Sequence, residues 1–218
     1  MRRRADEGYT RMQVPGMPGV FFRDLSLTLG PRALSIYGAS AVDVLAFRGR
    51  GPIPYWPVAW AAGLGLARHL AGLDLSGKRV LEVGCGVGIS GLGAAMAGGD
   101  VVVTDNQAPA LRLARMNARR NDVPLRAAAA DWRAWPFHER FDLVVGSDVT
   151  YEPAAFDALL AVLDLALEPE GEVLLTDPGR LMTTVFQQKA VAGGWSWQMT
   201  ALPREGTQPV FLYRLRRS

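Results

Sequence analysis

The most informative stretch of this chain reads Val80-Leu81-Glu82-Val83-Gly84-Cys85-Gly86-Val87-Gly88-Ile89-Ser90-Gly91. An apolar run ends in an acid, a glycine-rich turn follows, and small and apolar residues then predict a helix. Glycine is required where a backbone adopts a positive φ or approaches a ligand with no side chain between them. The start of the following helix offers unpaired N–H groups and a partial positive charge. We therefore expect a strand, a ligand-binding turn and a helix.

Apolar runs and helical stripes alternate beyond this turn. Strands are predicted at residues 79–83, 101–103, 125–130, 141–146 and 172–176. Helices are predicted at residues 58–71, 90–97 and 108–121, and two more follow residues 153 and 180. This alternation is typical of a parallel sheet with right-handed crossovers in an α/β fold. Two late strands, at 195–201 and 210–215, are predicted to form an antiparallel pair.

The N-terminal part follows a different pattern. Residues 1–18 are charged and then rich in glycine and proline, so we expect them to be loosely docked. Alternating apolar residues from Phe21 to Ser35, broken by Gly30-Pro31, predict two short strands joined by a turn. The predicted organisation is an N-terminal extension over 1–53, partly flexible with short strands, and one domain over 54–218.

Composition excludes several classes of protein. No run of about 18 apolar residues occurs, so we expect no membrane-spanning helix and no membrane partner. Acidic Asp6 and Glu7 follow the basic N-terminus where a signal peptide needs an apolar segment, which predicts a cytoplasmic protein. Cys85 is the single cysteine and only two histidines occur, so we expect neither a disulfide nor a metal site.

The charge pattern argues against a nucleic-acid partner. The net charge is only +3, and the arginines are scattered along the chain. A nucleic-acid-binding protein more often concentrates them in a stripe with aromatic residues. Solvated surface arginines are the simpler interpretation, and an acidic protein surface is the alternative partner.

Carboxylates recur where the predicted strands end. They are Glu82, Asp105, Asp131, Asp148 and Asp177. Ligands of open parallel sheets bind beyond the carboxyl ends of the strands. We therefore expect these side chains to describe one cleft.

The sequence of the turn is compatible with two nucleotide-like ligands. Gly86 to Gly91 satisfies G-x-G-x-x-G, with Asp105 at the place of a ribose-binding acid, so a dinucleotide site must be considered. A carboxylate at Glu82 would repel a pyrophosphate but attract an ammonium group. S-adenosylmethionine fits these charges, with Asp105 on the ribose, Asp131 on the adenine amino group and Trp132 on the ring.

From Pro54 onward the sequence resembles the class I, seven-stranded S-adenosylmethionine-dependent methyltransferases. Val80–Gly88 is similar to the E-x-G-x-G-x-G motif of that family. Asp148-Val149-Thr150-Tyr151 matches the D-x-x-Y signature of a family of protein-lysine methyltransferases. Residues 54–60 and 177–180 are similar to the branch that includes the electron-transfer-flavoprotein β-subunit lysine methyltransferases. The resemblance implies a Rossmann-like, doubly wound, mostly parallel seven-stranded sheet with an antiparallel C-terminal strand.

The resemblance and the residue chemistry together predict two sets of binding residues. S-adenosylmethionine, and its product S-adenosylhomocysteine, would contact Trp60, Glu82, Gly84, Cys85, Gly86, Gly88, Asp105, Asn106, Asp131, Trp132 and Ser147. Substrate would contact Tyr55, Trp56 and Arg180.

For catalysis we expect Asp148 to orient a neutral lysine amine and Tyr151 to line the acceptor channel. Each assignment has a simpler rival. Asp148 could cap a helix beginning near Pro153, Tyr151 and Trp132 could be core aromatics, and Arg180 could cap a loop. Trp56 and Trp60 could pack the first helix of the domain against the sheet, and Cys85 is expected to be a small turn residue, not a nucleophile.

Four functions follow from these patterns. The first is methylation of a lysine side chain in a protein substrate. The others are methylation of a small amine or other metabolite, cofactor binding without catalysis, and a nicotinamide dehydrogenase. The sequence specifies neither the acceptor, nor the number of methyl groups, nor the oligomeric state.

Overall fold

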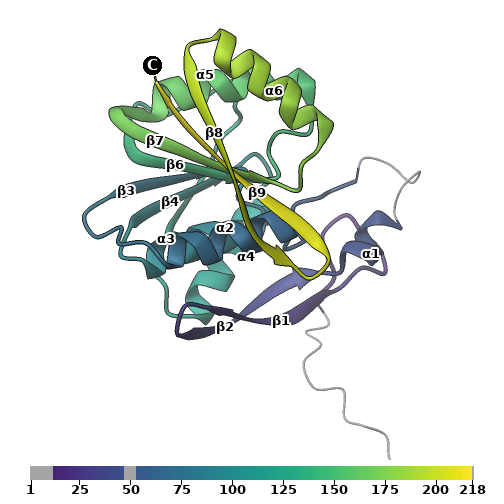
Figure 1. Cartoon of the computed structure of the whole chain (residues 1–218). Coiled ribbons are helices and arrows are strands. Elements are labelled where there is room, and N and C mark those ends of the chain that lie inside the picture. The colour runs from purple at the N-terminus through teal and green to yellow at the C-terminus, as the bar shows by residue number, and fades with distance from the viewer. Residues whose placement is uncertain (1–11, 47–52, 218) are drawn as a thin grey trace, which may run out of the picture.

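A computed structural model describes residues 12–46 and 53–217 of the chain (Figure 1). The basic N-terminal residues 2–4 and the acidic pair at 6 and 7 lie outside the described residues.

A seven-stranded sheet forms the centre of the molecule, in the order β5-β4-β3-β6-β7-β9-β8. The strands are β3 (Arg79–Val83), β4 (Asp100–Asp105), β5 (Arg126–Ala129), β6 (Phe141–Ser147), β7 (Leu167–Asp177), β8 (Trp195–Glu205) and β9 (Gln208–Arg217). The five strands from β3 to β7 pair in parallel, whereas β9 is antiparallel to both β7 and β8. The predicted fold class is confirmed.

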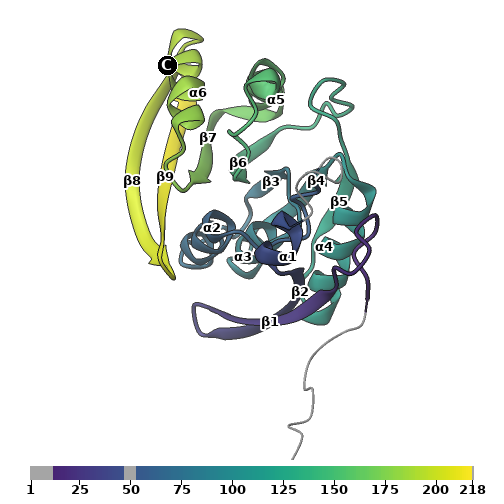
Figure 2. The ribbon, with the colours of Figure 1, turned by 90° about the vertical axis from the view of Figure 1, so that its right-hand side faces the viewer.

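Helices cover both faces of this sheet (Figures 1 and 2). On one side lie α2 (Ala61–Ala71), α3 (Ile89–Met96) and α4 (Ala108–Arg120); on the other lie α5 (Phe156–Ala166) and α6 (Leu181–Ala192). Successive strand residues point to opposite faces. Accordingly Val80 packs in the cluster under α2 and α3, whereas Leu81 packs in the cluster under α5 and α6.

The N-terminal residues form a hairpin that packs beneath the helices α2 and α4 (Figure 2). Strands β1 (Phe22–Leu29) and β2 (Arg32–Ala39) are antiparallel and are joined at Gly30-Pro31, as predicted. A short helix α1 (Ala41–Leu45) follows.

The expectation of a loosely docked segment is wrong for residues 12–18. Val14 and Met17 are each only 1% exposed, and they share a core with β1, β2 and the helices α3 and α4. Their apolar side chains gain more from burial than the glycine- and proline-rich composition indicates. The hairpin therefore belongs to the same packed body as the sheet.

Several element boundaries differ from the predicted ones. Strand β7 begins at Leu167, five residues before its predicted start. Leu167 follows the last residue of α5, has an extended backbone and pairs with Phe141; a bulge separates this pair from the rest of the β6–β7 pairing. Helix α2 begins at Ala61, since Trp60 has the extended backbone of an N-cap. The strands β8 and β9 are longer than predicted, and only Gly206-Thr207 separates them. Within the described ranges, none of the helices is both long and apolar enough to cross a membrane.

Candidate active site

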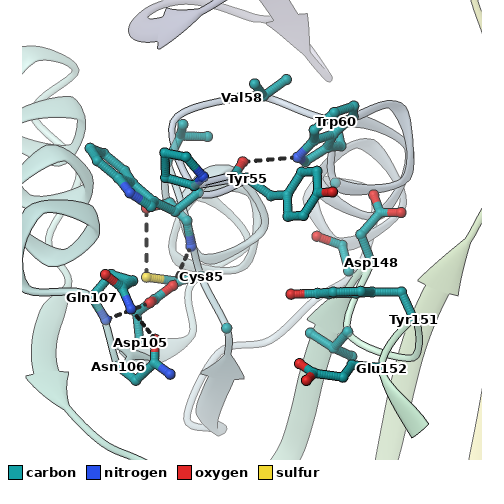
Figure 3. A pocket seen from close by; sticks show the side chains of 18 of the residues that line it. Tyr55, Val58, Trp60, Cys85, Asp105, Asn106, Gln107, Asp148, Tyr151 and Glu152 are labelled. Carbon is teal, nitrogen blue, oxygen red and sulfur yellow. Dashed lines mark hydrogen bonds between the residues drawn. The ribbon is translucent and has the colours of Figure 1, made fainter. Parts of the chain in front are cut away.

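A pocket of about 880 Å³ lies beyond the carboxyl ends of β3, β4 and β6 (Figure 3). Asp105, Asn106 and Gln107 lie on one side of it, and Asp148, Tyr151 and Glu152 lie on the other. Most of the predicted site residues line this pocket: Tyr55, Trp56, Trp60, Gly84, Cys85, Gly86, Asp105, Asn106, Asp131, Trp132, Ser147, Asp148, Tyr151 and Arg180. The structure therefore brings together residues that are up to 125 positions apart in the sequence, from Tyr55 to Arg180.

The glycine turn is shaped by close packing. Gly84, Gly86 and Gly88 have φ values of 65°, 52° and 79°, which only glycine adopts without strain. A Cβ on Gly86 would lie 2.9 Å from the carbonyl oxygen of Trp56. A Cβ on Gly88, which does not line the pocket, would lie 2.7 Å from the Cβ of Ala114. Packing against Trp56 thus requires bare backbone at Gly86, and packing against α4 requires it at Gly88.

Glu82 does not face the pocket. Its side chain is 1% exposed and lies beneath the turn, where it accepts a hydrogen bond of 2.9 Å from the backbone N–H of Gly91. Burial raises the pKa of this carboxyl to about 8, so it is mostly protonated at neutral pH. The prediction that Glu82 meets the ammonium group of the ligand is therefore wrong. Its role is to join the end of β3 to the first turn of α3.

This buried carboxyl predicts that stability falls as pH rises. In the unfolded chain Glu82 ionises near its ordinary pKa of 4.5, whereas in the folded protein it does so near 8. Between these values the folded state keeps a proton that the unfolded state releases, so rising pH favours unfolding. We expect Glu82→Gln, which is neutral at every pH, to flatten the fall of the melting temperature between about pH 5 and 8.

Thermal unfolding of both proteins across this range measures the effect. Asp142→Asn is the matched control, because the pKa of Asp142 lies below its ordinary value and this group is ionised in both states above pH 5. The control should leave the slope unchanged. An unchanged slope in Glu82→Gln would show that another group sets the pH dependence.

Asp105 ends β4 and does reach the pocket. Its two carboxylate oxygens accept hydrogen bonds from the backbone N–H groups of Gly86, at 3.0 Å, and Gln107, at 2.8 Å. Burial raises its pKa, and these hydrogen bonds oppose the shift. Each oxygen can accept a further hydrogen bond from a ligand in the pocket. Gln107 also lines the pocket and was missed, although its position before a predicted helix and after Asp105 was the available signal.

An aromatic wall faces Asp105 across the pocket (Figure 3). The indole N–H of Trp60 donates to the carbonyl of Tyr55 at 3.0 Å, which fixes the loop before α2. The ring of Tyr55 lies 6.2 Å from that of Trp60 and 5.9 Å, edge-on, from that of Tyr151. Tyr151 is 46% exposed, so it is not a core aromatic.

Trp56 and Trp132 have double roles. The ring of Trp56 packs against Phe22 of the hairpin at 6.1 Å, and Trp132 packs against the core under α5. Both also line the pocket. At Trp132 the core interpretation and a place in the pocket wall are therefore compatible, whereas the ring contact of Trp56 is with the hairpin and not between a helix and the sheet.

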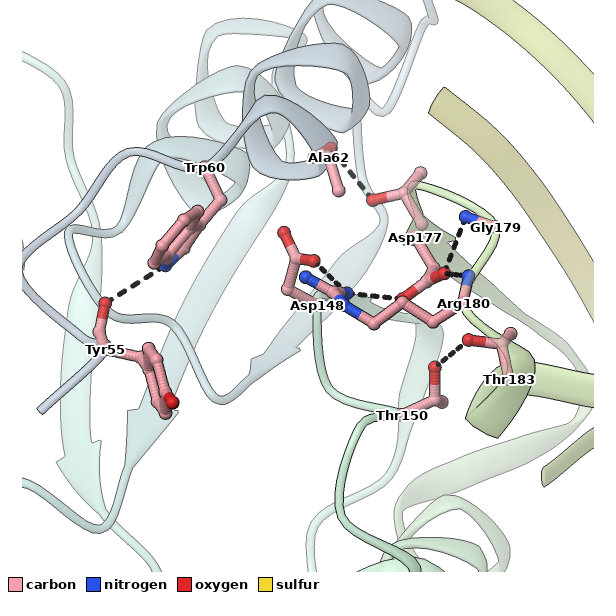
Figure 4. A network of polar contacts seen from close by, with 10 residues as sticks. Tyr55, Trp60, Ala62, Asp148, Thr150, Asp177, Gly179, Arg180 and Thr183 are labelled. Carbon is pink, nitrogen blue, oxygen red and sulfur yellow. Dashed lines mark hydrogen bonds and ion pairs between the residues drawn. The ribbon is translucent and has the colours of Figure 1, made fainter. Parts of the chain in front are cut away.

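Asp148 belongs to a network of three charged side chains (Figure 4). The guanidinium of Arg180 forms an ion pair with Asp148 and a second one, of 2.6 Å, with Asp177. Asp177 also accepts the backbone N–H groups of Gly179, at 2.7 Å, and Arg180, at 2.6 Å. Arg180 is thus paired with two carboxylates at the pocket wall, which the sequence did not indicate for a predicted substrate-binding residue.

The geometry of Asp148 is unusual. Its φ is 54°, in the left-handed region that few residues other than glycine adopt. Its side chain is 12% exposed, and burial raises its pKa while Arg180 lowers it. The helix-capping alternative is wrong, because Glu152 occupies the N-cap before Pro153. Asp177 was noted only as a strand-end carboxylate, and its place in this network was missed.

Comparison with known proteins identifies the family. Residues 56–185, more than half of the chain, match the family described as "Lysine methyltransferase". The electron transfer flavoprotein beta subunit lysine methyltransferase of Danio rerio is 32% identical over 133 residues, which are 59% of this chain and 52% of that protein. EEF1A lysine methyltransferase 3 of Mus musculus is 35% identical over 128 residues, 56% of this chain and 55% of that protein. The chain thus spans about half the length of these curated relatives.

Solved structures agree on the fold. The glycopeptide N-methyltransferase MtfA in complex with sinefungin superposes with a TM-score of 0.59 at 18% identity, covering 73% of this chain and 96% of that one. A ribosomal protein L11 methylase from Lactobacillus delbrueckii gives 0.57 at 23% identity, covering 72% and 77%. The dehydrogenase alternative has no support in these matches. The chain belongs to the lysine methyltransferase family, whose members take their methyl group from S-adenosylmethionine.

Proposed function

We propose that this protein transfers the methyl group of S-adenosylmethionine to the side-chain nitrogen of a lysine in a protein substrate, in the cytoplasm. The observation that carries the proposal is the Asp148 carboxylate on the pocket wall, in the D-x-x-Y motif, next to two exposed tyrosines. The family match over residues 56–185 and the names of the relatives support it.

The pocket suits the cofactor. The glycine turn and Asp105 would hold its ribose, and Trp132 and Asp131, which also line the pocket, would contact the purine ring and its amino group. When bound, S-adenosylmethionine supplies a methyl group on a positively charged sulfur. The described lining contains two cations, Arg133 and Arg180, of which Arg180 is already paired with carboxylates. The pocket therefore does not oppose a cationic ligand.

The acceptor side would attract and then orient an amine. With both carboxylates ionised, the Asp148–Arg180–Asp177 network carries a net charge of −1, which favours the approach of a lysine ammonium. Tyr55 and Tyr151 can stack on that cation at the mouth. A lysine amine must lose its proton before it attacks, because its ordinary pKa is near 10.4. Desolvation lowers that pKa, and Asp148 then accepts an N–H of the neutral amine and aims its lone pair.

The proposal predicts protein methylation that depends on Asp148. Purified enzyme incubated with labelled S-adenosylmethionine and a cell lysate should label protein, and mass spectrometry should locate the label on lysine. Asp148→Asn run in parallel identifies the bands that depend on the active site. Label found only in small molecules would contradict a protein acceptor.

The same experiment separates acceptor residues. The histone-arginine methyltransferase METTL23 of Homo sapiens is 26% identical over 155 residues, which are 67% of this chain and 82% of that protein. Peptide fragmentation distinguishes a methylated arginine from a methylated lysine. Label on arginine alone would overturn the assignment of lysine as the acceptor, but the assignment of S-adenosylmethionine as the methyl donor would stand.

A further inference from the structure

Two asparagines hold the N-terminal hairpin: Asn117 on α4 and Asn121 at the C-cap of that helix. Asn117 accepts the N–H of Tyr37 at 2.7 Å and donates to the carbonyl of the same residue at 3.1 Å. Asn121, one helical turn later, makes the same pair of bonds to Ser35, each of 2.9 Å. The two amide side chains thus pair with the backbone of β2 as a neighbouring strand would.

Asn117 also reaches the glycine turn. Its second side-chain N–H donates to the carbonyl of Val87 at 2.9 Å, and Val87 lines the pocket. Asn117 is fully buried, and each donor and the acceptor of its amide has a partner. One side chain therefore links β2 to the turn, whereas Asn121 links β2 only to α4.

The hairpin meets a second wall of the pocket two residues further along β2. The N–H of Ala39, the last residue of β2, donates to the carbonyl of Pro57 at 2.6 Å. Pro57 follows Tyr55 and Trp56, which line the pocket. Arg120 secures the hairpin from α4 through an ion pair of 2.6 Å with Asp24. The hairpin is thus braced against both the glycine turn and the aromatic loop.

We infer that Asn117 is a positioning residue of the cofactor site, and that cofactor binding and docking of the hairpin are coupled through it. The inference rests on the proposed function, since it takes the pocket to bind S-adenosylmethionine. Without the Asn117 amide, the carbonyl of Val87 would be left without its buried donor, and the turn would shift to find another. Coupling between two sites is reciprocal, so a ligand that holds the turn also holds the hairpin.

Calorimetry with S-adenosylhomocysteine tests the first half of the inference. Asn117→Ala should raise its Kd about tenfold or more, whereas Asn121→Ala, the matched control, should change it less than about threefold. Both variants lose hairpin bonds, so loosening of the hairpin alone would affect them equally. Equal Kd values for wild type and Asn117→Ala would overturn the inference and leave the proposed function intact.

Hydrogen exchange tests the reciprocal half, first in the wild-type protein and then in the two variants. In the wild-type protein, saturating S-adenosylhomocysteine should slow exchange at the backbone amides of residues 32–39. This protection should persist in Asn121→Ala and be lost in Asn117→Ala. Ligand binding with no added protection of β2 in the wild type would overturn the coupling. Wild-type protein that binds no S-adenosylhomocysteine would overturn the proposed function, and the inference with it.

Discussion

Asp148→Asn is expected to slow methyl transfer by about 10²–10⁴-fold, the contribution typical of a side chain that orients or accepts a proton. The variant keeps the shape of the side chain but loses its negative charge. It no longer attracts the incoming ammonium, and it orients the neutral amine less well. Asparagine also tolerates the left-handed backbone of this position, where φ is 54°. The loss therefore reports on charge and not on backbone strain.

The measurement is the initial rate of label incorporation into the acceptor identified from lysate. Binding of S-adenosylhomocysteine, followed by calorimetry, is the control and should be retained, because Asp148 acts on the acceptor. Asp148→Ala adds strain at positive φ, and a lower melting temperature than that of Asp148→Asn would reveal it. Wild-type rates in Asp148→Asn would contradict the mechanism.

Gly86→Ala is expected to raise the Kd for S-adenosylhomocysteine by about 100-fold. The φ of 52° costs an alanine about 1–2 kcal/mol. Its Cβ would lie 2.9 Å from the carbonyl oxygen of Trp56, and this overpacking costs about 1–3 kcal/mol more. This strain shifts the turn away from the conformation that binds the ligand. The apparent affinity therefore falls in proportion to the fraction of the protein that keeps the binding conformation.

Gly77→Ala is the control for backbone strain without overpacking. Gly77 has a φ of 75°, but a Cβ there would meet nothing within 4 Å. This variant should lose stability in thermal unfolding and keep its affinity for S-adenosylhomocysteine. If Gly86→Ala binds as tightly as Gly77→Ala, then the close approach of the turn to Trp56 does not shape the site.

The sequence predicted the parts of this molecule that depend on local patterns. Buried strands read as apolar runs, and the glycine turn and Asp105 stand at fixed places relative to them. The parallel order of the strands then brings their ends to one edge. For that reason the pocket and most of its lining residues could be assigned without coordinates.

The errors come from contacts between distant residues and from side-chain direction. Glu82 follows Leu81 in a strand whose side chains alternate between faces, and it points under α3 because the N–H of Gly91 lies there. Asp148 and Arg180 are 32 positions apart, and Asn117 and Tyr37 are 80 apart. No short pattern encodes such pairs. The burial of Val14 and Met17 was likewise invisible, because their partners lie on other elements.

The docking of the hairpin bears on which parts of the chain must fold together. The region that marks the family ends at residue 185, before β8 and β9, and it begins after the hairpin. Yet Val14 and Ile36 share a core with Leu92 and Leu113, and the pairing of β7 with β9 completes the sheet. The family match therefore covers a shorter stretch than the packed body does. A fragment limited to residues 56–185 would lose part of this core and the strands β8 and β9 of the sheet.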